Sequence, residues 1–158
     1  MKRGSEFEAP LTAEDMAELL SDDRIRLIRP WGGYRPGEAD LEKLNDFFRL
    51  RPEVTFCATE PGQLKGLPEL QRVTEPVSGC FGEALEDLKA LKRLRSLGLT
   101  EADFTALPAY ADTLEELSLS GRFGKKSGAC LSMLTRLKAL SLSGTTLESF
   151  ACIGKLQL

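Results

Sequence analysis

Acidic side chains are the residues of this chain that could carry acid–base chemistry, because the sequence contains no histidine. The usual nucleophilic triads depend on histidine and are therefore excluded. Neighbouring carboxylates, which could divide the roles of acid and base, occur at Glu14–Asp15, Glu83–Glu86–Asp87 and Glu115–Glu116. Charged groups of this kind usually lie on solvated turns, so the sequence predicts a protein that is not an enzyme.

Phosphate and metal sites are disfavoured by the same test of residue type and spacing. The segment GRFGKKSG at 121–128 is rich in glycine but lacks the spacing of a phosphate-binding P-loop. Cys57, Cys80, Cys130 and Cys152 include no C-x-x-C pair, and no histidine can complete a zinc site. We expect no cofactor and no metal, and we expect the cysteines to be small buried residues in a reducing compartment.

The net charge and the hydropathy of the chain argue against several classes of binding partner. The net charge is −3 over 158 residues, with a pI of about 5.2, which disfavours nucleic acid and anionic membranes as partners. No apolar run approaches the ~18 residues of a membrane span, and no secretory signal is visible. The sequence therefore predicts a cytoplasmic protein. GSEF at 4–7 looks like a cloning remnant, so residues 1–8 are expected to be a tail outside the fold.

Two almost identical octapeptides, LEELSLSG at 114–121 and LKALSLSG at 137–144, indicate an internal repeat. The shared pattern is L-x-x-L-x-x-L-x-L, with its third leucine at positions 97, 117 and 140. Its apolar positions are Leu91, Leu94, Leu97 and Leu99; Ala111, Leu114, Leu117 and Leu119; and Leu134, Leu137, Leu140 and Leu142. A weaker copy lies upstream, at Leu64, Leu67, Leu70 and Val73.

The spacing of these leucines predicts the structure of one repeat. The L-x-L step alternates with period two, as in a short strand, whereas leucines three apart fit a tight helical or 3₁₀ turn. Such a unit cannot bury its leucines alone, so successive units must stack into a solenoid.

The N-terminal third predicts helices between strands. A helix capped by Thr12 is followed by a strand centred on Leu27, and a helix beginning near Asp40 is followed by a strand centred on Phe56. The apolar stripes of the two helices are Met16, Leu19 and Leu20, and Leu41, Leu44, Phe47 and Phe48. We expect residues 9–63 to form a cap and the first β-α-β coils.

The repeat resembles the leucine-rich repeat family, and its short period resembles that of the bacterial internalin-like branch. The resemblance covers 64–158, although the usual asparagine of the turn is replaced by Ala102, Arg122 and Thr145. It implies an α/β solenoid: a curved parallel sheet of about six short strands, helices or 3₁₀ turns on the convex side, and a helical N-terminal cap. The repeats are expected to be truncated at the C-terminus.

The resemblance also implies a binding surface on the concave face, formed by the residues between the strand leucines. These residues are Arg72, Thr74, Ser96, Gly98, Thr100, Glu116, Ser118, Ser120, Ala139, Ser141 and Ser143. Thr55, Cys57, Arg24 and Arg26 are expected to continue the rows upstream. A protruding loop at 121–128 is expected to carry Arg122, Lys125 and Lys126.

The function implied by the resemblance is a non-enzymatic protein–protein interaction module. A toxin-neutralising or regulatory inhibitor, and a substrate-recognition fragment of a larger enzyme, are the alternatives. The partner is expected to be a protein, with self-association through an uncapped C-terminal coil as a further possibility.

Overall fold

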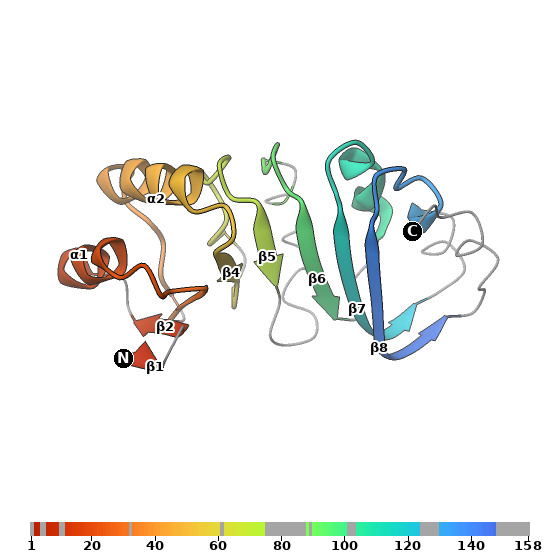
Figure 1. The fold of residues 1–158 in the computed structure, drawn as a ribbon, viewed down its shortest axis with the longest axis horizontal. Coiled ribbons are helices and arrows are strands. Elements are labelled where there is room, and N and C mark those ends of the chain that lie inside the picture. The colour runs from red at the N-terminus through yellow and green to blue at the C-terminus, as the bar shows by residue number, and fades with distance from the viewer. Residues whose placement is uncertain are drawn as a thin grey trace.

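A single sheet organises the chain (Figure 1). The computed structural model describes residues 2–3, 6–9, 12–31, 33–60, 62–74, 88, 90–100, 104–123 and 130–147. The strands are β1 (Lys2–Arg3), β2 (Glu6–Ala9), β3 (Leu27–Pro30), β4 (Thr55–Cys57), β5 (Arg72–Thr74), β6 (Ser96–Thr100), β7 (Glu116–Phe123) and β8 (Ala139–Leu147). The helices are α1 (Ala13–Ser21), α2 (Glu38–Leu50) and the 3₁₀ helix η1 (Phe104–Tyr110).

The strands follow one another across the sheet in sequence order, from β1 to β8. Strands β2 to β8 are parallel, and β1 alone is antiparallel to its neighbour. The sheet is curved and open, which confirms the expected α/β class and curved parallel sheet. No helix within the described ranges is both long and apolar enough to cross a membrane.

One buried ladder of side chains runs through all seven parallel strands. Its members occupy matching register positions: Phe7, Ile28, Phe56, Val73, Leu97, Leu117 and Leu140. The first six are buried and Leu140 is partly buried against them. Because side chains alternate along a strand, this ladder fixes the flanking residues on the opposite face.

The repeated leucines build the same turn before β5, β6 and β8. Amide groups donate to the carbonyl three residues earlier at Leu67→Leu64, Leu91→Leu88 and Leu134→Leu131, over 3.3, 2.8 and 3.1 Å. This is the hydrogen-bond pattern of a 3₁₀ turn, as the spacing predicts.

The start of each later strand is fastened to the preceding unit in the same way. The amides of Arg95 and Ser96 both donate to the Gln71 carbonyl, those of Glu115 and Glu116 to Arg95, and those of Lys138 and Ala139 to Glu115. A recurring backbone pattern of this kind is typical of stacked repeats.

The two α-helices lie beside the N-terminal strands (Figure 1). Thr12 caps α1 as expected: its hydroxyl accepts from the Asp15 amide at 3.3 Å, and the Asp15 carboxylate accepts from the Thr12 amide at 2.8 Å. Helix α2 begins before Asp40, with Gly37 at the N-cap. Its buried Phe48 contacts Phe47 and Phe56 edge to face, which joins the helix to β4.

Three expectations about the strands need correction. The sheet contains seven parallel strands rather than about six, because Glu6–Ala9 form β2, which includes the last three residues of the segment 1–8 that was expected to lie outside the fold. In the first predicted strand the core residue is Ile28 and not Leu27. Leu27 and Arg29 therefore lie on the face opposite the core, where Arg24 and Arg26 were expected. A one-residue slip exchanges the two faces of a strand.

The expected loop at 121–128 also begins too early. Strand β7 continues to Phe123, and Arg122 pairs with Thr146 of β8 after an irregularity in register between Ser120 and Arg122. Gly121 and Gly144 allow the bend with φ of 97° and 60°, conformations that side chains disfavour. Lys125 and Lys126 lie outside the described residues, as does the C-terminal segment 148–158.

Candidate functional site: the open face and the amino edge

We call the surface opposite the buried ladder, over β5 to β8, the open face. The register places all eleven expected concave-face residues on it in three rows. These rows are Arg72, Ser96, Glu116 and Ala139; Thr74, Gly98, Ser118 and Ser141; and Thr100, Ser120 and Ser143. The residues are small apart from Arg72 and Glu116, so the face has little relief.

Charges on the open face are paired with each other. Arg72 Nη2 lies 2.6 Å from Glu116 Oε2, and this contact passes over Ser96 of the intervening strand. The paired charges lie near one end of the face, whereas Ser118, Ala139, Ser141 and Ser143 are exposed.

Close packing fixes the shape of the middle rows. A Cβ atom on Gly98 would lie 2.7 Å from Thr74 Oγ1, so glycine leaves room for the threonine of the neighbouring strand. In the next row, the hydroxyls of Thr100 and Ser120 are 3.0 Å apart and hydrogen-bonded. These contacts hold polar groups in place on the sheet surface.

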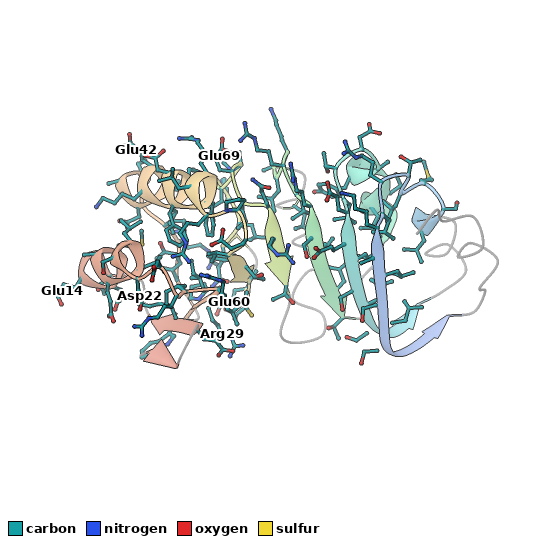
Figure 2. The ribbon with its side chains drawn as sticks, viewed as in Figure 1. Glu14, Asp22, Arg29, Glu42, Glu60 and Glu69 are labelled. Carbon is teal, nitrogen blue, oxygen red and sulfur yellow. The ribbon has the colours of Figure 1, made fainter. Side chains whose placement is uncertain are left out.

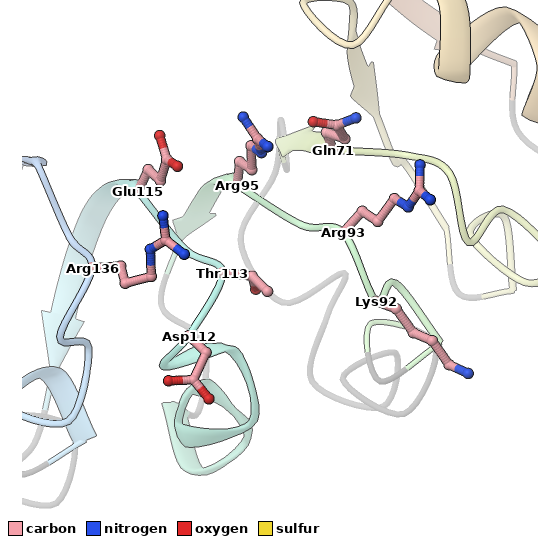
Figure 3. Close-up of a pocket in the computed structure, with 8 residues that line it drawn as sticks. All are labelled: Gln71, Lys92, Arg93, Arg95, Asp112, Thr113, Glu115 and Arg136. Carbon is pink, nitrogen blue, oxygen red and sulfur yellow. The ribbon is translucent and has the colours of Figure 1, made fainter.

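We call the border at which β5 to β8 begin the amino edge. It carries a hollow of about 250 Å³ between successive units (Figure 3). The lining residues are Gln71, Lys92, Arg93, Arg95, Asp112, Thr113, Glu115 and Arg136. A second hollow of about 220 Å³ shares Gln71, Arg95 and Glu115 with the first and extends to Arg72 and Glu116 on the open face.

The carboxylates of the amino edge join neighbouring units. Glu69 accepts from Arg93 at 2.8 Å, and Glu115 accepts from Lys138 at 2.9 Å. The hydrogen bond from Lys138 lowers the pKa of Glu115, and the positive charges of Lys138, Arg95 and Arg136 add to this effect. Glu115 is therefore ionised at neutral pH.

Three of the carboxylates considered for acid–base chemistry are held by structural contacts. Asp15 belongs to the cap of α1, and Glu115 and Glu116 each accept a hydrogen bond from a basic side chain. Figure 2 shows Glu14 and Glu42 on the outer sides of α1 and α2. The group at 83–87 lies outside the described residues.

The sequence carried a signal for the amino edge that the leucine pattern obscured. Basic residues flank a buried apolar residue immediately before β6, at Arg93-Leu94-Arg95, and before β8, at Arg136-Leu137-Lys138. Each triplet places both basic side chains at the border of the sheet. Only the stacking of units shows that the two triplets meet at one hollow.

Gln63 is a second residue that the sequence did not single out. Its fully buried carboxamide accepts from the amides of Thr59 and Glu60 at 2.8 and 3.2 Å and donates to the Trp31 carbonyl at 3.4 Å. It therefore satisfies backbone groups inside a turn. Figure 2 shows Glu60 beside this turn.

Within the described part of the chain, no group of three or more histidine, cysteine, aspartate or glutamate side chains is placed to hold a metal ion. Comparison with known proteins gives no further assignment: no family model, curated protein or solved structure matches the chain.

Proposed function

We propose that the chain is a leucine-rich-repeat-type module that binds a partner protein through its open face. The observation that carries this proposal is the register, which aligns eleven small or paired polar residues in rows over four strands. The same register places the leucines of β6 and β7 in the core. The face is thus not needed for packing and is available for a partner.

The open face is nearly flat, and this shape favours a protein over a small molecule as its binding partner. Specific protein interfaces bury ~800 Å² on each partner, and a broad face of serine, threonine and glycine can accept such an area. The larger hollow, about 250 Å³, lies at the border of the sheet and not in the face. Small ligands bind in enclosed pockets of ~300–1,000 Å³.

Site-specific photo-crosslinking tests the proposal. A photoreactive amino acid is placed at Ser118 or Ser141 on the open face and, as controls, at the exposed positions Ala17 on α1 and Leu50 on α2. Variants are incubated with an extract of the source cells, and captured proteins are identified by mass spectrometry. We expect one protein to be captured at both open-face positions and at neither control position.

Capture at all four positions or at none would contradict the proposal. The identity of the captured protein also separates the narrower functions. A co-encoded toxin indicates an inhibitor, and a protein that carries an enzymatic modification indicates substrate recognition for a larger enzyme.

A further inference from the structure

Charge along the amino edge follows the repeat. The basic triplets before β6 and β8 occupy equivalent positions in their units, so that Arg95 corresponds to Lys138. In the unit between them, the equivalent residue is acidic: it is Glu115. Upstream, Glu69 precedes β5. Acidic and basic units thus alternate from β5 to β8.

Each basic triplet uses one cation to join a neighbouring unit. Arg93 pairs with Glu69, and Lys138 pairs with Glu115. The second cation of each triplet, Arg95 or Arg136, is exposed and makes no side-chain hydrogen bond or ion pair with any described residue. Among the described residues, Arg95 and Arg136 therefore contribute positive charge near Glu115 without a hydrogen bond or ion pair of their own.

Both of these arginines line the larger hollow. Figure 3 shows them reaching from the units on the two sides of Glu115, with Arg93 and Lys92 on the far side of the hollow. The lining contains four cations and two carboxylates, so it has a net positive charge within a chain of net charge −3. The ion pair of Glu115 is made with Lys138 and not with either arginine, so both guanidinium groups can donate hydrogen bonds to an anion.

We propose that the amino edge is a binding site for an acidic peptide segment, whose carboxylates lie between Arg95 and Arg136. Guanidinium groups suit this ligand because their planar donors match a carboxylate in a two-point contact. This surface borders the open face but is distinct from it, so the inference goes beyond the proposed function.

The two acidic residues of the hollow select a peptide over a nucleic acid. Asp112 and Glu115 would lie close to the evenly spaced phosphates of a nucleic-acid strand and repel them. A peptide can instead present backbone amides to these carboxylates beside its own acidic side chains. The alternation of charge along the edge thus fits a chain that carries both acceptors and donors.

Binding of a fluorescent oligoglutamate peptide, measured by anisotropy at low salt, tests the inference. Arg95→Gln/Arg136→Gln should weaken binding at least about tenfold, a loss of about 1.4 kcal/mol or more, because both guanidinium groups lose their charged contacts with the peptide. Lys43→Gln/Lys65→Gln removes the same charge from exposed sites elsewhere and should change the affinity less than about twofold.

Equal weakening in the two double variants would show non-specific attraction and overturn the inference. Tighter binding of an oligothymidine strand than of the peptide, abolished by the same arginine substitutions, would also overturn it in favour of a nucleic-acid site. Unchanged thermal melting of the arginine variant serves as the check that the sheet remains folded. This assay requires no partner for the open face, so its outcome is separate from that of the crosslinking experiment.

Discussion

Arg72 and Glu116 lie on strands that are not neighbours, yet their side chains meet at 2.6 Å. Adjacent strands are ~4.8 Å apart, so the pair spans roughly twice that distance across β6. The contact is possible because the residue between them on the open face is Ser96, whose side chain is short. The pair therefore connects three consecutive units on the outer surface of the sheet.

A double-mutant cycle on Arg72→Ala and Glu116→Ala measures this connection. Both side chains are partly exposed, so we expect a coupling free energy of only about 0.5–1 kcal/mol in urea unfolding. In a Ser96→Leu background the larger side chain should separate the charges, and the coupling should vanish. Coupling that persists with leucine at this position would show that the pair does not pass over residue 96.

Substitution of adjacent residues in β7 tests which face is buried. Leu117→Ala should lower the free energy of unfolding by about 2–5 kcal/mol, the usual loss for a buried leucine. Ser118→Ala, on the exposed face, should change it by less than about 0.5 kcal/mol. Leu97→Ala in β6 should behave like Leu117→Ala. Equal melting temperatures for the two β7 variants would contradict the register.

Removal of the Gln63 carboxamide should destabilise the fold. Gln63→Leu leaves the buried amides of Thr59 and Glu60 without their acceptor, and each such loss costs about 1–3 kcal/mol. We expect a decrease of at least about 2 kcal/mol in chemical unfolding. Gln71→Leu is the matched control, because that half-buried side chain makes no hydrogen bond with the described residues, and its effect should stay below about 0.5 kcal/mol. Similar losses for both variants would argue against a special role for Gln63.

The two tyrosines of the chain should resist ionisation in alkali. Burial, with a contribution from the charge of Asp40, raises the pKa of Tyr34 to about 12, and burial raises the pKa of Tyr110 as well. Both hydroxyls are buried and have no hydrogen-bond partner among the described residues. The pKa of Tyr34 is higher in the folded protein than the value of 10 in the unfolded protein, so the folded state favours the neutral phenol. The stability that depends on the neutral phenol is present below pH 10 and is lost as the pH rises towards 12.

Ultraviolet absorbance of tyrosinate measures this effect. The folded protein should show almost no tyrosinate at pH 10.5, whereas protein unfolded in guanidinium chloride should titrate with a midpoint near 10. A tyrosine that ionises near pH 10 while near-ultraviolet circular dichroism still reports the fold would contradict the buried placement.

Local pattern was sufficient to predict β6 and the first parts of β7 and β8, since leucines spaced by three and then two fit only one arrangement of core and surface. It did not predict the extension of β7 to Phe123 and of β8 to Leu147. The local pattern was insufficient for β3. The sequence RIRLI at 24–28 allows a strand with Leu27 in the core and equally a strand with Ile28 in the core. Only pairing with β2 and β4 selects Ile28 for the core. Strand β2 itself is short, and its Phe7 becomes buried only beside β3.

Of the candidate sites, the open face could be predicted from the sequence, whereas the amino edge and Gln63 could not. The open face follows from the period of two within each strand, so its residues could be named from the sequence. The amino edge combines Gln71, Arg95, Glu115 and Arg136 from four units, and the hollow between them is a product of stacking. Gln63 was hidden because its burial depends on the path of the turn around it and not on any periodic pattern.

The affinity of the crosslinked partner for open-face variants tests the central claim most directly. Purified partner is titrated against Ser118→Arg/Ser141→Arg, which places two large charged side chains side by side on β7 and β8. Ala17→Arg/Leu50→Arg adds the same charge at exposed helix positions. A protein-binding open face predicts that the first variant raises the Kd at least about tenfold, a loss of about 1.4 kcal/mol, and that the second leaves it within about twofold. An unchanged Kd for the serine variant, or equal losses for both, would contradict binding through the open face.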